Sequence, residues 1–173
     1  MIVRRGEILA RYEKFSHSEH EKWDRRTPNY FNRVNPERID SVERAGSFVF
    51  PQIYRAFLIE IGSGVYKEDS QGNVLEFSGN GFLSPEEVLQ YVRKETPEWN
   101  MDPTYLEPGD IPFFHVGDEL VLIFRQNDLD RGAVYQQYGK TPRLATFELF
   151  LEFLYDDVNV YRSPIFRDGL LRQ

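Results

Sequence analysis

A histidine and an aspartate near the middle of the chain have the residue types that enzymes use to move protons. His115 lies three residues before Asp118, and an imidazole beside a carboxylate could act as a general base with the group that orients it. The two residues flank a turn between apolar runs, and no nucleophile lies near them in the sequence. We therefore expect His115 to be an ordinary strand residue with a local hydrogen bond, and we expect no catalytic residue.

Two other stretches contain side chains that could bind a metal. His17 and His20 have the i, i+3 spacing of helical metal ligands, and Glu21 could add an oxygen. No further protein ligand is recognisable near them, so we expect no metal site there. The stretch from Asp128 to Gly132 resembles a calcium loop, but the ligand register fails and no glutamate closes it. It is therefore predicted to be a hairpin turn, and no cofactor or metal is expected.

Helices and hairpins must position these residues. Apolar residues at helical spacing predict helices over residues 8–15, 37–45, 51–61, 85–94 and 147–155. Alternating or continuous apolar runs bounded by turn residues predict strands over residues 65–68, 74–77, 120–124 and 132–138. The first two strands flank DSQGN and are predicted to form a hairpin, and so are the last two.

Residues with strong positional preferences mark where the helices begin and end. Gly46 is expected to close the second helix, and Pro51 fits the first position of the third, which Gly62 would end in a left-handed conformation. Ser84 and Glu87 form a capping-box pattern at the start of the fourth helix. Thr146 is likewise the expected N-cap of the last helix, whose apolar stripe is predicted to be Phe147, Phe150, Leu151 and Leu154.

Helices at both ends that enclose a run of hairpins predict an α+β fold, a single domain with a mainly antiparallel sheet. The chain has 173 residues, 40% of them hydrophobic and 28% charged, which suits one core that needs no metal. We expect residues 1–36 to be an N-terminal extension packed on the domain, residues 37–160 to be the domain itself and residues 161–173 to be a C-terminal tail.

The balance of charge limits the kinds of partner. The chain carries 28 acidic and 21 basic residues, so its formal net charge is −7, and it contains no cysteine. An acidic chain is repelled by a phosphate backbone, so we expect no direct binding to nucleic acid, and a basic protein is the better partner. Acidity can also serve solubility alone. The N-terminus resembles no signal peptide and no apolar run could cross a bilayer, so we expect a cytoplasmic protein without a membrane partner.

Taken in order, the predicted segments resemble the SUKH superfamily, the SMI/KNR-type domain of a fungal cell-wall-synthesis regulator and of many bacterial immunity proteins. The resemblance covers about residues 37–156, and the order and spacing of the motifs carry it. The matching segments are residues 51–58 followed by Gly62, residues 80–87, residues 112–114 followed by Gly117-Asp118, residues 132–135 and residues 144–151.

The resemblance implies a non-enzymatic protein. Bacterial members of this superfamily mostly bind a cognate polymorphic toxin, often a nuclease or deaminase, and block it by occlusion. The fungal branch implies an alternative, a regulatory or scaffold domain that binds a cellular protein. An acidic inhibitor suits a toxin with a basic, phosphate-binding cleft, because complementary charge speeds encounter and improves discrimination.

The resemblance transfers no toxin-contact residue, so the contact surface is predicted from residue type. We expect it to use exposed loop carboxylates, namely Asp69, Asp118, Glu119, Asp128 and Asp130. Trp23 and Tyr30 are alternative aromatic anchors of the kind that interfaces favour. These two rings could equally fix the N-terminal extension to the domain, because large aromatic side chains are usually buried.

Overall fold

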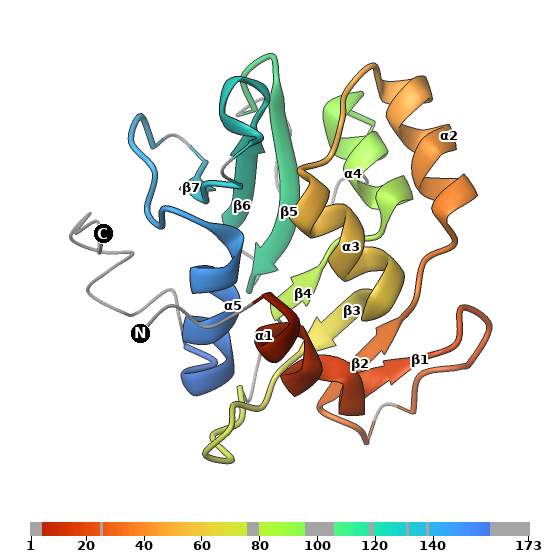
Figure 1. Ribbon diagram of the computed structural model, residues 1–173, viewed down its shortest axis with the longest axis vertical. Helices are drawn as coiled ribbons and strands as arrows, with labels where there is room; N and C mark the ends of the chain where they lie inside the picture. Colours follow the sequence, from red (N-terminus) through yellow and green to blue (C-terminus); the bar gives the residue numbers. More distant parts are fainter. Residues whose placement is uncertain are drawn as a thin grey trace.

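One sheet runs through the computed structural model, which describes residues 5–24, 26–75, 80–95, 106–117, 120–130, 132–137 and 139–159 (Figure 1). Its strands are β1 Ser16–His17, β2 Asn29–Asn32, β3 Ser63–Tyr66, β4 Asn80–Phe82, β5 Asp110–Val116, β6 Leu120–Arg125 and β7 Tyr135–Gln136. Each strand pairs with the next along the chain, and every pair except β1–β2 is antiparallel. The predicted α+β fold with a mainly antiparallel sheet is therefore confirmed.

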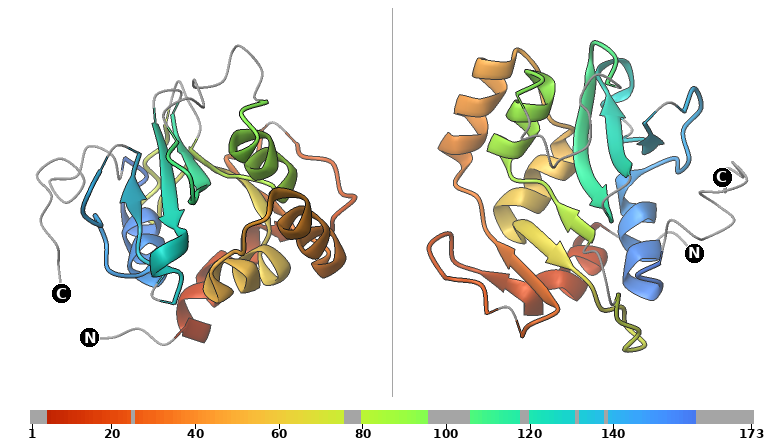
Figure 2. Two further views of the ribbon diagram at one scale, coloured as in Figure 1. Left: turned by 90° about the horizontal axis from the view of Figure 1, so that it is seen from above. Right: turned by 180° about the vertical axis from the view of Figure 1, so that it is seen from behind.

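The α-helices occupy two places around this sheet (Figure 2). They are α1 Arg5–Tyr12, α2 Pro36–Gly46, α3 Gln52–Glu60, α4 Pro85–Val92 and α5 Phe147–Asp156. Short 3₁₀ turns follow α1 at Glu13–Phe15 and β6 at Gln126–Asp128. Helices α1, α3 and α5 gather on one face, whereas α2 packs against α4 beside the sheet. Strands that are adjacent in the sequence are also adjacent in the sheet, and the helices pack against that sheet. Many short elements can therefore share one core.

Aromatic rings fill the space between α3, α5 and the sheet. Phe147, the first residue of α5, is fully buried and meets five other rings edge to face. The ring centroids of Tyr54, Phe57 and Phe113 lie 5.5, 5.5 and 5.6 Å from that of Phe147, with interplanar angles above 80°. Edge-to-face contacts of this kind are favourable beyond the area they bury. Phe147 therefore joins α5 to α3 and β5.

The helix caps predicted from the sequence are present in α4 and α5. The Ser84 hydroxyl accepts from the backbone N–H of Glu87, and the Glu87 carboxylate accepts in return from the backbone N–H of Ser84 at 2.7 Å. The Thr146 hydroxyl accepts from the backbone N–H of Leu149 at 3.3 Å. The four residues predicted for the apolar stripe of α5 are all buried. Local sequence signals were sufficient for these two helices.

Two other predicted helix boundaries are wrong by one residue. Helix α2 continues through Gly46, and the left-handed residue that ends it is Ser47, with φ 54°. Gly46 serves packing instead, because a Cβ there would lie 2.4 Å from the Phe48 ring. Pro51 is the N-cap of α3 and not its first helical residue, since its ψ of 138° is extended.

The predicted hairpin between residues 65–68 and 74–77 is wrong in its pairing. Strand β3 pairs with β4, with Gly64 opposite Phe82, and the chain between them makes only a single bridge from Glu68 to Val74. Residues 76–79 lie outside the described part of the chain. The hairpin predicted for residues 120–124 and 132–138 is confirmed as β6 with β7.

The N-terminal segment enters the sheet and the core. Strand β2 pairs with β3 through Phe31 opposite Gly64, and Phe31 is fully buried. Tyr12 of α1 is also fully buried, and its hydroxyl donates to the Leu151 carbonyl of α5 at 2.6 Å. Burial raises the pKa of Tyr12 well above the ordinary value, so the hydroxyl stays a donor. This segment therefore supplies core side chains in addition to covering the domain.

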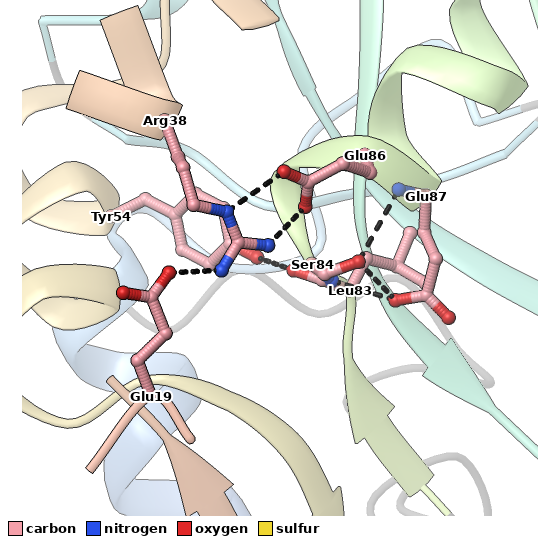
Figure 3. A network of polar contacts seen from close by, with 7 residues as sticks. All are labelled: Glu19, Arg38, Tyr54, Leu83, Ser84, Glu86 and Glu87. Carbon is pink, nitrogen blue, oxygen red and sulfur yellow. Dashed lines mark hydrogen bonds and ion pairs between the residues drawn. The ribbon is translucent and has the colours of Figure 1, made fainter. Parts of the chain in front are cut away.

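A polar network joins α2, α4 and the turn after β1 (Figure 3). Arg38 makes a bidentate contact with Glu86, at 3.0 and 2.7 Å, and a further contact with Glu19. Beneath it, the buried Tyr54 hydroxyl lies 3.0 Å from the Leu83 carbonyl oxygen. Exposed ion pairs stabilise a fold only slightly, but a bidentate arginine fixes orientation. The network therefore sets how α2 sits against α4.

We predict that Gly62→Ala destabilises the protein by about 3 kcal/mol or more. Gly62 has φ 120°, and a Cβ there would lie 2.1 Å from the backbone carbonyl oxygen of Asn32. Gly72→Ala is the matched control, because Gly72 also has a positive φ, 83°, but a Cβ there meets nothing within 4 Å. We expect it to cost about 1–2 kcal/mol. Urea unfolding followed by circular dichroism measures both, and equal losses would contradict the prediction.

Candidate functional site

The hollow around His115 contains the residue types of a hydrolytic triad but not the triad's connections. Ser63, Glu87 and His115 all line a hollow of about 290 Å³ beside β3, β4 and β5. His115 Nε2 lies 3.0 Å from the Tyr91 hydroxyl. Glu87 Oε2 accepts from the backbone N–H and the hydroxyl of Ser84, at 2.7 and 2.8 Å. The imidazole and the carboxylate thus both have structural partners.

His115 is a strand residue, as predicted, and its hydrogen-bond partner lies on a helix. It belongs to β5, where it pairs with Val121 of β6, and Tyr91 reaches it from α4. Burial, reinforced by the nearby charge of Glu87, raises the pKa of Tyr91 to about 12. The tyrosine is therefore neutral at ordinary pH and can hold the ring in place. Asp118, the other half of the acid/base hypothesis, lies outside the described residues.

His17 does not have the helical geometry that metal binding at i, i+3 requires. It lies on β1, its Nδ1 is 3.0 Å from Glu21 Oε1, and its ring stacks on Tyr30 with centroids 4.1 Å apart. Over the described ranges, no three histidine, cysteine, aspartate or glutamate side chains are grouped so as to hold a metal ion. His17 and Glu21 are therefore explained by their contact with each other and by the stacking on Tyr30.

Asp69 is a correction to the predicted contact surface, because it is buried and not exposed. Its side chain is 6% exposed and accepts from the backbone N–H groups of Gln71, Asn73 and Val158, at 3.0, 2.9 and 3.3 Å. Burial alone would raise the pKa of Asp69, but these bonds and one from the Asn73 amide outweigh it and lower the pKa. Asp69 therefore organises the β3–β4 connection and its contact with the end of α5.

The two predicted aromatic anchors differ in exposure. Tyr30 lies on β2 and is only 5% exposed, which supports the alternative that it fixes the N-terminal segment to the sheet. Trp23 is 38% exposed, its indole N–H donates to the Thr27 carbonyl at 3.1 Å, and the Lys67 ammonium lies 6.0 Å from its ring centroid. Trp23 therefore remains available to a partner.

Of the remaining predicted carboxylates, the structure describes Asp128 and Asp130, which follow β6. Asp118 and Glu119 lie outside the described residues. Asp128 is half-buried, and its Oδ2 accepts from the Tyr135 hydroxyl at 2.9 Å. Asp130, two residues further along the same loop, is exposed. The structure thus makes Asp128 part of the loop's framework and leaves Asp130 facing solvent.

A groove near Asp130 brings exposed apolar surface and carboxylates together. Two hollows, of about 590 and 480 Å³, share Val49 in their walls. They lie where the α2–α3 connection, residues 47–51, meets the loop after β6, residues 126–130. We call the two hollows together the acidic groove, defined by Asp40, Glu43, Val49, Gln126, Asp130 and Glu148.

The first wall owes its shape to the extended segment SFVFP. Side chains alternate in an extended chain, so Phe48 and Phe50 turn inward while Val49 turns outward. The two phenylalanines are 6% and 2% exposed and pack edge to face at 5.0 Å, whereas Val49 is 55% exposed. An apolar side chain is therefore fixed on the surface by its buried neighbours.

Glu43 anchors this wall to α2 and α3. Its Oε1 accepts from the backbone N–H of Phe50 at 2.8 Å, and its Oε2 pairs with Arg55 at 2.9 Å. Arg55 also contacts Asp40. Charge-assisted bonds of this kind are stronger than neutral ones, particularly where the groups are partly buried. One carboxylate thus holds the α2–α3 connection at both the backbone and the start of α3.

The opposite wall is held by a cation stacked on a ring. Arg125 at the end of β6 lies over the Tyr135 ring, 4.5 Å from its centroid, and donates to the Gly139 carbonyl at 2.6 Å. The Gly132 backbone packs closely against Ile53 of α3, because a Cβ on Gly132 would lie 3.1 Å from Ile53 Cγ2. These contacts hold the loop after β6 against α3.

Among the described side chains that line the groove, acidic groups outnumber basic ones. The acidic members are Asp40, Glu43, Asp130 and Glu148, and Arg44 is the basic member. A concave surface of one sign attracts partners of the opposite sign and repels phosphates. The arrangement can therefore bind a cationic, partly apolar surface.

Sequence reasoning identified Asp130 but missed Val49, Glu43 and Glu148. The alternation in Phe-Val-Phe was a signal for an outward valine, because it places Val49 opposite two aromatic residues. No local signal links Glu43 or Glu148 to Asp130, since the three residues come from α2, α5 and the loop after β6. Only the tertiary fold brings them together.

Similarity to known proteins comes from a family model. Residues 33–155 match the model of the SMI1 / KNR4 family (SUKH-1). The matched range contains both walls of the acidic groove and leaves out α1, β1 and β2. No curated protein and no solved structure shows significant similarity to the chain. Among the described residues, no helix has both the length and the apolar character needed to cross a bilayer.

We predict that Glu43→Gln lowers the free energy of unfolding by about 1–3 kcal/mol, because the pairing with Arg55 is lost while a polar group stays partly buried. The matched control is Glu37→Gln, which removes an exposed carboxylate from the first turn of the same helix. That change should cost about 0.3–1 kcal/mol through the helix dipole. Thermal unfolding measures both, and a loss at Glu43 no larger than that at Glu37 would contradict the anchoring role.

We predict that Asp69→Asn destabilises the protein at pH 7 and destabilises it less at pH 3. The folded-state pKa of Asp69 is lowered, so the carboxylate's contribution is present above about pH 4, the ordinary pKa of an unfolded aspartate, and is lost as pH falls through the folded pKa. Urea midpoints of both proteins at pH 7 and pH 3 give the comparison. A stability difference that stays constant between these pH values would show that the charge is not responsible.

Proposed function

The chain belongs to the SMI1 / KNR4 family (SUKH-1), which includes immunity proteins, and from this membership we propose that it is a non-enzymatic immunity protein. It would act in the cytoplasm by binding a cognate polymorphic toxin, a nuclease or deaminase, and occluding it. The acidic groove is the observation that supports this proposal best. It presents carboxylates and a fixed apolar side chain on one surface, as a protein-binding site requires.

Electrostatics supports a toxin that acts on nucleic acid. An enzyme of that kind has a basic cleft for phosphates, and an acidic inhibitor can occupy this cleft in their place. The net charge of −7 favours the same encounter over the whole surface. Occlusion needs no chemical step by the inhibitor, which agrees with the structural partners of His115 and Glu87.

The test is protection of a bacterial host from a candidate cognate toxin, sought among the products of the genes beside this chain's gene. We expect co-expression of the chain to restore colony formation and the purified chain to inhibit the toxin's turnover at one-to-one stoichiometry. Gly62→Ala serves as a control for folding, because it should weaken protection through loss of folded protein. A folded wild-type chain that binds the toxin without reducing its activity, or that does not bind it, would contradict the proposal.

The regulatory alternative makes the opposite genetic prediction. A strain that lacks this gene would survive challenge with the neighbouring toxin if the chain served as a scaffold for a cellular protein. If the chain is the antidote, the same strain is killed, and a plasmid copy restores its survival.

A further inference from the structure

We propose that the acidic groove holds a basic segment of the partner that places an apolar side chain against Val49 and cationic side chains against Asp130 and Glu148. This proposal adds detail to the proposed function and rests on it, because the proposed function identifies the partner as a toxin. The chemistry of the segment follows from contacts on both sides of Val49.

The apolar contact follows from the fixed position of Val49. Phe48 and Phe50 are buried on either side of it, and Glu43 binds the backbone N–H of Phe50, so the valine cannot turn inward without breaking these contacts. Among the residues that the structure describes, the exposed large hydrophobic side chains are Val49, Val74 and Trp23. Of these, Val49 lines a hollow on each side, which gives a partner's side chain room to cover it.

The cationic contacts follow from a difference among the four groove carboxylates: two of them already form ion pairs with an arginine of this chain. Asp40 and Glu43 both pair with Arg55, so their charge is balanced within the fold. Over the described ranges, no ion pair engages Asp130 or Glu148. The groove carboxylates that no described ion pair balances therefore lie on the side formed by the loop after β6 and the start of α5. A cation from a partner gains most on that side.

The loop presents Asp130 because a neighbouring carboxylate holds it in place. Asp128 accepts a hydrogen bond from the Tyr135 hydroxyl, and the Arg125 guanidinium lies over the Tyr135 ring. The Gly132 N–H donates to the Leu129 carbonyl at 3.1 Å. Asp130 lies between these two fixed points and is exposed. A preorganised charge costs less ordering on binding than one on a free loop.

The charge of the groove also disfavours a nucleic acid or a second copy of this chain as its ligand. A nucleic acid would bring phosphates to a surface whose lining is mainly acidic, and a second copy of this chain would bring a further net charge of −7. A basic protein segment satisfies the carboxylates and covers the valine at once. The groove is therefore suited to a segment in which an aliphatic residue lies between lysines or arginines.

The experiment uses a defined peptide so that it does not depend on the toxin. The full chain, labelled with ¹⁵N, is titrated with the acetylated and amidated peptide Lys-Arg-Leu-Arg-Lys and followed by NMR. We expect shift changes centred on the amides of Val49, Gln52, Asp130 and Glu148. A peptide with serine in place of leucine should bind more weakly, and Gln-Gln-Leu-Gln-Gln should show no detectable binding.

Variants separate the two carboxylates that the proposal uses from an exposed carboxylate outside the groove. The double variant Asp130→Asn/Glu148→Gln should lower peptide affinity by at least about threefold and reduce its dependence on salt. The control Glu60→Gln removes an exposed carboxylate at the other end of α3 and should leave affinity unchanged. Shift changes centred on another face, no binding, or equal affinity of the folded double variant would overturn the proposal.

The outcomes for the groove and for the immunity function can be told apart. If the peptide binds as expected but the chain does not protect against the toxin, the groove stands and the proposed function fails. If protection is intact in wild type and undiminished in the double variant, the immunity function stands and the toxin binds elsewhere.

Discussion

Packing of aromatic rings around Phe147 is the constraint on which the rest of this structure depends. Phe147 begins α5, and rings from α3 and β5 meet it edge to face. The same residue lies beside Gly132, where a Cβ would be 3.6 Å from Phe147 Cβ. The core therefore determines where the loop after β6 lies relative to α3. Because these segments carry the two walls of the acidic groove, the packing inside the molecule sets the geometry on its surface.

Features encoded within a few residues could be predicted from the sequence. Ser84 and Glu87 define a cap by residue type alone, and the spacing of apolar residues in α5 identifies which of them are buried. Strand β6 with its partner β7 follows from an apolar run and a short loop. The same local signals, taken in order, carry the resemblance that the family match over residues 33–155 confirms.

Features created by distant contacts could not be predicted in this way. Strand β3 pairs with β4, and Asp69 holds the turn that follows β3; nothing in the local sequence shows that this carboxylate is buried. The parallel pairing of β1 with β2 also has no local signal. The groove is of this kind, since α2 contributes two of its carboxylates and α5 and the loop after β6 contribute one each. For such sites, the sequence indicates which types of side chain are present but not which of them the fold brings together.

In residues 47–51, separate side chains serve folding and recognition, and this has a consequence for how recognition can evolve. The buried neighbours and the backbone hydrogen bond to Glu43 hold this segment, and none of them involves the Val49 side chain. Position 49 can therefore be replaced with little loss of fold stability while the shape offered to a partner changes. Stability and specificity are thus encoded in adjacent residues that can mutate independently. A chain built this way can follow a changing antagonist one substitution at a time without first acquiring compensating changes in its interior.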